Sequence, residues 1–461
     1  MNYDLTILGG GPGGYVAAIR AAQQGAKVAL IEKEYVGGTC LNYGCIPTKS
    51  LIRSVEVLET VNQAKEFGVK AENMGLDLKT VIERKEKVVE TVRGGVEDLI
   101  SSYPIDMIYG TGRCLDKNTI EIEGVNGENH TIVTDKLIIA TGSKTYNPGI
   151  AGADLPGVIN SKGALSLEVI PDEVCIVGGG VIGIEFAYIL NAFGAKVKVL
   201  ELLPEILEFA DKEMVGYLKE SLTFKGVEFV TNAQVKSITK TSDGLSIVYS
   251  IDGEDYELDA GLVLLAMGRI PQTKGVETLN LDEAGRNGIA VNAAMETNIP
   301  GVYAIGDVTG GAQLAHLAMA QGLVAADNAV GGDKTFKNDS IPYCIYSKPE
   351  MAWVGLTEDE AREKFGNLKI GRFPFTSSGK ALVDGDTEGL VKLIIDEKYG
   401  EIVGLHLIGP ESTNMIAEGV LARMLESTAV EMALAIHPHP TLSEVLMEAA
   451  YMSIGEGIHY R

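Results

Sequence analysis

The sequence predicts an α/β fold built from two similar βαβ units and a C-terminal α+β region. A glycine-rich pattern that starts at Gly9 returns 169 residues later at Gly178. From Pro342 the pattern changes, because alternating apolar runs, 389–396 and 402–408, precede helical stretches. A length of 461 residues is enough for about three domains, each with its own core.

The first βαβ unit is predicted at the N-terminus. The apolar run from Asp4 to Leu8 is typical of a buried parallel strand, and a helical stretch, 15–24, follows it. That helix ends at Gly25, and a second apolar run ends at Glu32. The fingerprint glycines between strand and helix are Gly9, Gly11 and Gly14. They allow close approach of a pyrophosphate to the helix N-terminus, and Glu32 would accept hydrogen bonds from a ribose diol.

The second unit repeats each of these features. An apolar run, 174–177, precedes a helical stretch, 184–193, and Glu201 closes the next apolar run. Its fingerprint glycines are Gly178, Gly180 and Gly183. One such fingerprint would be weak evidence because glycines also cluster in turns, but both copies have the strand, the helix and the acid at the same offsets. The repeat therefore predicts two Rossmann-like dinucleotide-binding domains.

Two cysteines, Cys40 and Cys45, lie in the run GGTCLNYGCIPTK shortly after the first fingerprint. In a regular helix, positions five residues apart are about 140° apart around the axis. A disulfide between them requires a bent first turn, for which Gly44 supplies the backbone freedom. Such a bond is easier to reduce than a structural disulfide and can carry electrons. The alternative is two ordinary buried thiols.

Further along the chain, an amphipathic helical stretch, 54–99, predicts a surface hairpin. An apolar run, 262–265, leads into a turn at Gly268, and the run AMETNIPGVYAIGD places Asp307 at a strand end. A helix is predicted to begin near Leu314, so Asp307 either binds a polyol chain or caps a helix.

Composition excludes several classes of function. A net charge of −24 and a pI near 4.7 argue against binding to nucleic acid or to anionic membranes. Five is an odd number of cysteines and does not fit the disulfide framework of a secreted protein. The acidic Asp4 lies where a signal peptide would carry positive charge, so we expect a cytoplasmic protein. None of the six histidines has a metal-ligand spacing, and no metal is expected. The three remaining cysteines, Cys114, Cys175 and Cys344, are predicted to be structural.

Taken together, these motifs resemble those of the class I pyridine nucleotide–disulfide oxidoreductases over essentially the whole chain. The resemblance is carried by the paired fingerprints, the cysteine run, the Thr141-Gly142-Ser143 turn, the run 294–307 and the C-terminal HPHPTLSE, 437–444. It implies an FAD-binding domain at 1–145, an NAD-binding domain at 146–270, a central domain at 271–341 and a C-terminal dimerisation domain at 342–461. The protein is then expected to be a homodimer.

The resemblance also implies catalytic roles. Cys45 faces the flavin, Cys40 exchanges with the substrate, His439 is the acid–base and Glu444 orients it. The chemistry of the residues agrees, because a dithiol must lose a proton before attack and an imidazole held by a carboxylate suits that task.

Cofactor-binding residues are implied in the same way. Lys49 lies near flavin N5 and pairs with Glu185, and Asp307 binds the ribityl chain. The remaining residues implied to contact a cofactor are Gly112, Thr141, Gly142, Ser143, Gln313, Leu314, Ala315, His316, Val235 and Gly268.

The implied reaction is oxidation of protein-bound dihydrolipoamide to lipoamide, with electrons passing through Cys40–Cys45 and FAD to NAD. The partner would be a lipoylated acyltransferase of a 2-oxo acid dehydrogenase complex or the lipoyl carrier of glycine cleavage. The alternatives are a glutathione- or mercuric-reductase type of enzyme and a catalytically idle flavoprotein subunit. The chain departs from the common pattern at Tyr43, where relatives usually carry a small apolar residue.

Overall fold

The first glycine fingerprint follows strand β1 (Asn2–Leu8), as predicted, and runs into helix α1 (Pro12–Gln23), which begins three residues before the predicted stretch and includes Gly14. Strand β2 (Val28–Glu32) runs parallel to β1 and completes the βαβ unit. Gly25 ends α1 with φ +87°, a left-handed conformation that glycine adopts at little cost. The computed structural model describes residues 2–72, 74–337 and 339–460.

The chain divides into two compact units. The first unit comprises Met1–Pro148, Asn160–Glu168 and Met267–Lys337, and the second comprises Gly149–Ile159, Val169–Ala266 and Asn338–Arg461. The predicted FAD-binding and central domains supply most of the first unit. Among the described residues, no helix is both long and apolar enough to cross a membrane.

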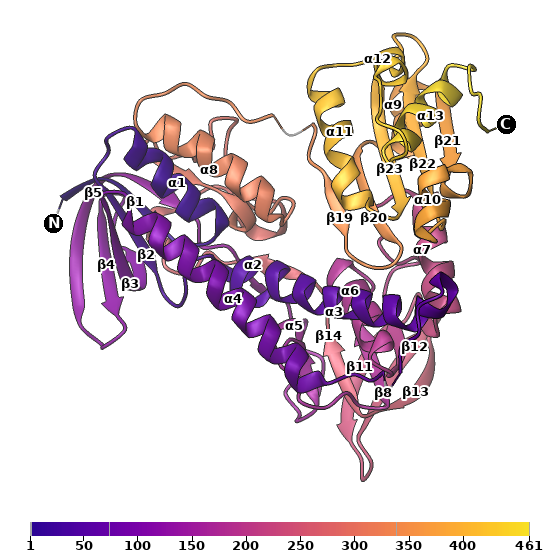
Figure 1. The fold of residues 1–461 in the computed structure, drawn as a ribbon. Coiled ribbons are helices and arrows are strands. Elements are labelled where there is room, and N and C mark those ends of the chain that lie inside the picture. Colours follow the sequence, from indigo (N-terminus) through magenta and orange to yellow (C-terminus); the bar gives the residue numbers. More distant parts are fainter. Residues whose placement is uncertain (1, 73, 338, 461) are drawn as a thin grey trace. The chain divides into compact units, whose positions relative to one another are not determined.

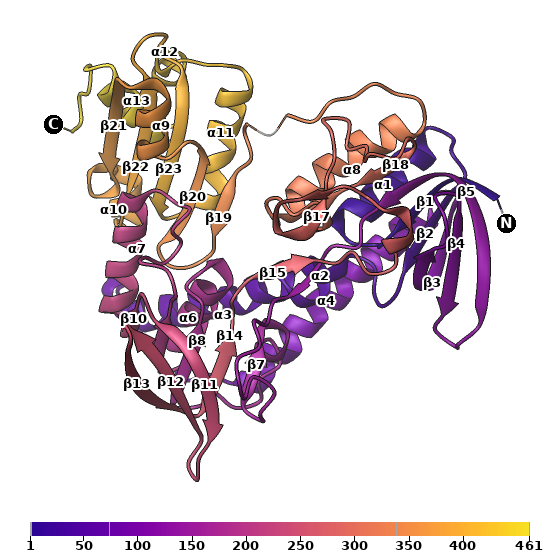
Figure 2. The same cartoon turned by 180° about the vertical axis from the view of Figure 1, so that it is seen from behind.

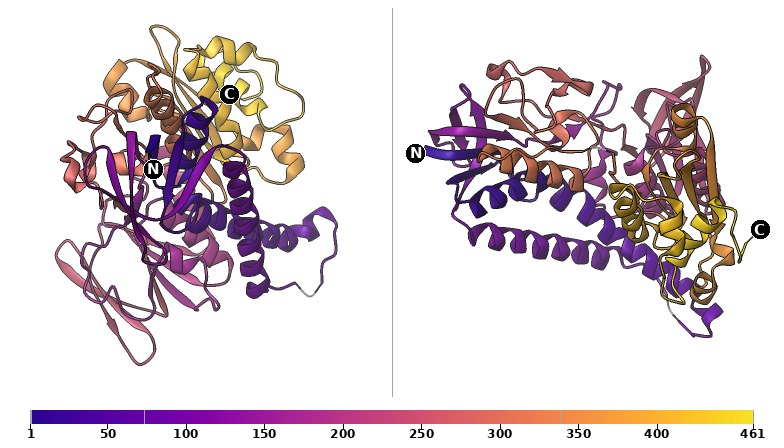
Figure 3. Two further views of the ribbon diagram at one scale, coloured as in Figure 1. Left: turned by 90° about the vertical axis from the view of Figure 1, so that its left-hand side faces the viewer. Right: turned by 90° about the horizontal axis from the view of Figure 1, so that it is seen from above.

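A parallel sheet forms the centre of the first unit (Figure 1). Its parallel strands follow the order β3 (Ile105–Cys114), β2, β1, β5 (Asn129–Ile139) and β18 (Val302–Ala304). Strand β4 (Thr119–Gly124) pairs antiparallel with β3 and β5. Helices α1 and α8 (Ala315–Ala329) lie against each other (Figure 3). Their buried alanines belong to the same apolar cluster as Leu5, Ile7 and Leu30.

Around the cysteine run the first unit is helical. Helix α2 (Gly38–Tyr43) is followed closely by α3 (Cys45–Gln63) and η1 (Ala64–Phe67), and α4 (Leu78–Ser101) begins after a further ten residues. The predicted hairpin is therefore present, but α3 begins at Cys45 rather than at Ser54, because the cysteine run is itself helical. The short elements of this unit are β6 (Ser143–Thr145), α5 (Ser161–Ala164), β15 (Arg269–Pro271), η2 (Glu277–Leu279), β16 (Glu283–Ala284), η3 (Gly285–Asn287), β17 (Gly288–Ile289) and η4 (Gly306–Thr309).

The second fingerprint lies in the second unit, between β8 (Glu173–Val177) and α6 (Val181–Ala192). The sheet follows the order β10 (Val227–Val230), β9 (Lys196–Leu200), β8, β14 (Leu262–Leu265) and β7 (Val158–Asn160). Helix α7 (Lys212–Phe224) precedes β10. A separate antiparallel sheet contains β11 (Gln234–Lys240), β12 (Leu245–Ile251) and β13 (Glu254–Ala260) (Figure 2).

The C-terminal region is α+β, as predicted. Its five antiparallel strands follow the order β19 (Tyr343–Ile345), β20 (Glu350–Gly355), β23 (Ile402–Gly409), β22 (Leu390–Asp396) and β21 (Leu368–Pro374). The helical elements are α9 (Glu358–Phe365), η5 (Phe375–Ser377), α10 (Gly379–Asp384), α11 (Ser412–Met424), α12 (Ala429–Leu434) and α13 (Glu444–Ser453). Together with the two parallel sheets, this region completes the α/β fold class that the sequence predicts.

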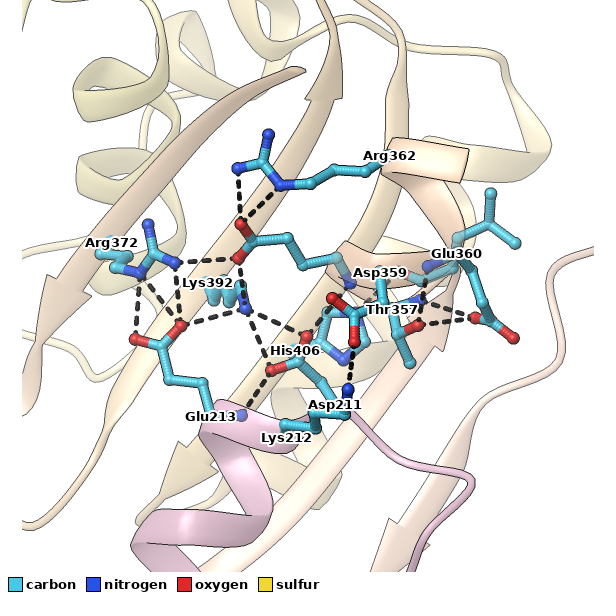
Figure 4. A network of polar contacts seen from close by, with 12 residues as sticks. Asp211, Lys212, Glu213, Thr357, Asp359, Glu360, Arg362, Arg372, Lys392 and His406 are labelled. Atoms are coloured by element: carbon cyan, nitrogen blue, oxygen red, sulfur yellow. Dashed lines mark hydrogen bonds and ion pairs between the residues drawn. The ribbon is translucent and has the colours of Figure 1, made fainter. Parts of the chain in front are cut away.

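A buried ionic network joins α7 to this C-terminal sheet (Figure 4). The Lys392 side chain on β22 is 2% exposed, and its Nζ lies 3.0 Å from Asp211, 3.0 Å from Glu213 and 2.7 Å from Glu358. Asp211 also caps α7 by accepting a hydrogen bond from the Glu213 N–H. Burial of so many charges is tolerated because each has an opposite partner.

Candidate active site

The two acids predicted to bind ribose, Glu32 and Glu201, occupy equivalent positions and make equivalent hydrogen bonds. In the first unit, Glu32 Oε2 accepts the Gly10 N–H at 2.8 Å and Oε1 accepts the Glu34 N–H at 2.9 Å. In the second unit, the carboxylate of Glu201 accepts the N–H groups of Gly179 and Leu203. Each pair of contacts is offset by the same 169 residues, so both carboxylates are fixed beside their glycine turns.

Both glycine turns fit a dinucleotide. A Cβ on Gly14 would lie 1.8 Å from the carbonyl oxygen of Gly9, and one on Gly183 would lie 1.9 Å from that of Gly178. Only glycine therefore permits the close packing of helix on strand at these positions. A Cβ on Gly180 would meet nothing within 4 Å, which leaves space beside the α6 N-terminus for a pyrophosphate.

The structure brings the two predicted redox cysteines together. Cys40 lies in α2 and Cys45 begins α3, and the helices are separated at Gly44, whose φ of −141° and ψ of −110° are not helical. A hydrogen bond with Cys45 and then burial raise the pKa of Cys40, while the nearby Lys49 lowers it. The predicted bend is thus present where the sequence places it.

Asp307, Ser143 and an arginine that the sequence analysis did not select form one polar cluster. The Ser143 hydroxyl donates to Asp307 Oδ2 at 2.5 Å, and Arg269 Nε donates to the Ser143 Oγ at 2.8 Å. Burial raises the pKa of Asp307, but Ser143 and Arg269 oppose that rise. Asp307 does not cap a helix, because the cap residues of η4 and α8 are Ile305 and Leu314.

Arg269 also connects this cluster to the cysteines. Its Nη2 donates to the Ser143 carbonyl at 2.7 Å and lies 3.5 Å from the Thr39 hydroxyl, next to Cys40. Burial lowers the pKa of Arg269, and Asp307 and Cys45 raise it. The signal that could have identified Arg269 is its place directly after the apolar strand and Gly268.

The other residues predicted to contact a cofactor lie in the same two units. In the first unit, Gln313 donates to the Arg269 carbonyl at 3.3 Å, and Thr141 donates to the Gln272 carbonyl at 2.6 Å. Leu314, Ala315 and His316 form the start of α8, Gly112 lies in β3, and Gly142 and Gly268 have positive φ. In the second unit, Val235 lies in β11 at a bulge, and buried Glu185 accepts the Tyr346 N–H at 3.1 Å.

In the second unit, His439 and Glu444 form the predicted pair. The His439 Nδ1 lies 2.9 Å from Glu444 Oε1, while Oε2 accepts the Thr441 N–H at 2.8 Å. Burial alone would raise the pKa of Glu444, but Thr441 and His439 outweigh it and lower that pKa. Glu444 is therefore ionised near neutrality and selects the tautomer of His439 that leaves Nε2 free to accept a proton.

Comparison with known proteins agrees with this geometry. Residues 3–322 match the model of the pyridine nucleotide-disulphide oxidoreductases, and residues 341–450 match that family's dimerisation domain. The chain belongs to this family. Pyridine nucleotide-disulphide oxidoreductases of this kind use FAD and NAD, the two cofactors that the resemblance implies.

Relatives of known function are similar over the full length. The chain is 45% identical to a dihydrolipoyl dehydrogenase of Bacillus subtilis, over all of this chain and 99% of the relative. It is 42% identical to that of Thermus scotoductus, over 99% of both chains. Among solved structures, LpdA of Mycobacterium tuberculosis matches with a TM-score of 0.90 at 25% identity, covering 97% of this chain and 98% of that one. The flavoprotein disulfide reductase RclA of Escherichia coli matches with a TM-score of 0.87 at 28% identity, covering 98% and 99%.

Proposed function

We propose that this oxidoreductase is a dihydrolipoyl dehydrogenase, which oxidises dihydrolipoamide on a carrier protein and reduces NAD. The observation that carries the proposal is the pairing of Cys40 with Cys45 across the helix break at Gly44, in the segment whose start hydrogen-bonds to the first glycine turn through the Gly37 N–H and the Gly10 carbonyl. Relatives named dihydrolipoyl dehydrogenase at 38–45% identity over nearly the whole chain support it.

In this proposal His439 accepts a proton from a substrate thiol at Nε2, because Glu444 holds Nδ1. The substrate thiolate attacks Cys40 Sγ, the Cys40–Cys45 bond breaks, and Cys45 leaves as a thiolate. The second substrate thiolate then attacks the mixed disulfide, which closes the lipoamide ring and releases Cys40. Two electrons have passed from the substrate dithiol to the cysteine pair.

The cofactors would be held by the residues already placed. We assign FAD to the first unit, with Glu32 at a ribose, Asp307 at the ribityl chain, and Lys49 and Cys45 at the flavin. NAD is assigned to the second unit, with Glu201 at its ribose and Glu185 in helix α6, next to the second fingerprint. The chemistry that the bound cofactors supply is the onward transfer of the two electrons as a hydride to NAD.

The proposal includes a homodimer with shared sites, in which His439 of one chain serves the cysteines of the other. An exposed apolar face on α11, α12 and the segment after them supports it, since such faces mark interfaces. Its residues are Leu421, Met424, Leu425, Leu434 and Ile436, which are between 58% and 98% exposed. The partner is a lipoylated acyltransferase of a 2-oxo acid dehydrogenase complex or the glycine-cleavage lipoyl carrier, and the net charge of −24 is consistent with a cytoplasmic enzyme.

The test is a turnover assay with matched cysteine variants. The FAD-loaded protein should reduce NAD with dihydrolipoamide, and on two-electron reduction it should show a long-wavelength charge-transfer band from the Cys45 thiolate. Cys45→Ser should remove both signals and retain FAD, whereas the control Cys344→Ser should retain both. Turnover or a charge-transfer band that survives Cys45→Ser would contradict the proposal. Turnover with oxidised glutathione but not with dihydrolipoamide would also contradict it, in favour of a glutathione-reductase type of enzyme.

A further inference from the structure

Three side chains that the implied mechanism does not use meet at the end of the redox helix α2. Tyr43 is its last residue, and its hydroxyl donates to Glu34 Oε1 at 2.5 Å. Lys162 Nζ lies 3.3 Å from the same oxygen and 3.6 Å from the centroid of the Tyr43 ring. We call this group the Tyr43 clamp. All three residues belong to the first unit, although Lys162 is far from the other two in the sequence.

The clamp connects the redox helix to the nucleotide-binding loop. Glu34 lies two residues after the end of β2, and its N–H donates to Glu32 Oε1. The other oxygen of Glu32 accepts the Gly10 N–H of the glycine turn. Burial alone would raise the pKa of Glu34, but Tyr43 and Lys162 outweigh it and lower that pKa. Glu34 is thus a charged acceptor anchored to the rigid start of the fold.

Helix α2 is held on more than one side, and the contact of Arg269 with Thr39 is one of its anchors. On its buried side, Asn42 Nδ2 donates at 3.0 Å to the carbonyl of Val36, which precedes the helix. On the more exposed side, the clamp holds Tyr43, immediately before the break at Gly44. When the Cys40–Cys45 bond is open, these anchors restrain α2 relative to α3.

We propose that the Tyr43 clamp is a positioning device that keeps Cys40 close to Cys45 in the reduced enzyme and so sets the dithiol–disulfide equilibrium of the pair. This inference rests on the redox role given to the cysteines in the proposed function. A crosslink costs more entropy to form when its two ends move more freely in the open state. Loss of the clamp frees α2 only in the reduced form, because the disulfide itself restrains the oxidised form. The disulfide therefore becomes easier to reduce.

The expected effect is modest and measurable. A hydrogen bond to a charged group shifts an equilibrium by about tenfold, and solvent exposure of Glu34 reduces this. Tyr43→Phe should therefore favour the dithiol by about three- to tenfold, which corresponds to about 15–30 mV for a two-electron couple. Lys162→Met should shift the equilibrium in the same direction by less, because the tyrosine hydroxyl remains.

The experiment compares Tyr43→Phe with Tyr35→Phe in the FAD-loaded enzyme. Tyr35 is a close control, because it is a neighbouring tyrosine that is not one of the three clamp residues. The guanidinium carbon of Arg93 lies 4.5 Å from the centroid of the Tyr35 ring. Each protein is equilibrated in mixtures of reduced and oxidised dithiothreitol, quenched with acid and alkylated. The oxidised fraction of the peptide containing Cys40 and Cys45 is then measured by mass.

A shift in Tyr43→Phe that is absent in Tyr35→Phe supports the inference. Equal midpoints for wild type and Tyr43→Phe overturn it, and a lower Tm with an unchanged midpoint shows that the clamp stabilises the fold without positioning the cysteines. The dithiothreitol titration measures the Cys40–Cys45 disulfide and does not depend on the identity of the substrate. If the wild-type cysteine pair titrates normally but the enzyme does not turn over dihydrolipoamide, the proposed substrate is rejected and this inference still holds. A wild-type pair that never forms a disulfide rejects both.

Discussion

Lys392→Met is expected to destabilise the second unit by about 3 kcal/mol, because it leaves one buried carboxylate without a cation. Lys392 contacts three carboxylates, but Arg372 Nη2 remains 2.9 Å from Glu213 and 2.9 Å from Glu358. Asp211, whose side chain is 3% exposed, loses its lysine. Removing one partner of a buried pair costs about 3–5 kcal/mol, and two backbone N–H groups that still bind Asp211 place this case at the lower end.

Trp353 provides the assay. It is the single tryptophan of the sequence, is 3% exposed, and lies in β20 of the sheet that contains Lys392. Its fluorescence during urea unfolding of the FAD-loaded protein, at one fixed protein concentration, gives the free energy of unfolding. A loss of about 3 kcal/mol corresponds to a Tm lower by roughly 6–12 °C. The control is Lys380→Met, which removes a more exposed pair with Asp384 and should cost less than about 0.5 kcal/mol.

The pH dependence gives a second check with a defined sign. Burial raises the pKa of Asp211, but His406 and Lys392 outweigh it and hold that pKa below its usual range. Burial also raises the pKa values of Glu213 and Glu358, but Lys392 and nearby arginines outweigh it and lower them. Carboxylates with lowered pKa stabilise the fold above their unfolded pKa, and this stability is lost as the pH falls through the folded pKa.

The advantage of wild type over Lys392→Met should therefore be complete at pH 7 and should shrink below about pH 4. A Lys392→Met protein that unfolds like the Lys380→Met control at pH 7 would refute the reasoning. So would a difference between wild type and Lys392→Met that does not shrink on acidification.

Two further predictions concern cofactor choice and assembly. NAD should be strongly preferred over NADP, because Glu201 is predicted to accept from a 2′-hydroxyl and its charge would repel a 2′-phosphate. Comparable kcat/KM values for both cofactors would reject this. Co-refolding two inactive variants, Cys45→Ser and His439→Gln, should restore roughly a quarter of wild-type activity, since about half the dimers are mixed and each has one intact shared site. If each chain has a complete site of its own, mixing restores nothing.

Local patterns predicted the parts of the fold that depend on local chemistry. Both βαβ units, the break at Gly44 and the start of the helix near Leu314 follow from glycine positions and apolar runs, and the structure confirms them. The helix-cap alternative for Asp307 was wrong. Its carboxylate accepts a hydrogen bond from Ser143, which is distant in the sequence, and other residues cap η4 and α8.

Contacts between distant segments could not be predicted in this way. Arg269 reaches Ser143 only because β15 pairs antiparallel with β6, and neither strand is long enough to give a clear signal. Lys392 stands within the apolar strand LVKLIID, where nothing local indicates that its partner is Asp211, 181 residues away. The roles of individual residues at the cofactors remain predictions for the same reason, since they depend on contacts with groups outside the chain.

The double hydrogen bonding of Glu201 limits how cofactor preference can change. Its carboxylate accepts from the N–H groups of Gly179 and Leu203, so the acid maintains the shape of the loop in addition to the ribose-binding role predicted for it. An arginine at this position would add a cation for a 2′-phosphate but would leave two backbone donors without their acceptor. A switch to NADP therefore requires a redesigned loop that satisfies those donors itself, and the path to it through single substitutions passes through less stable proteins.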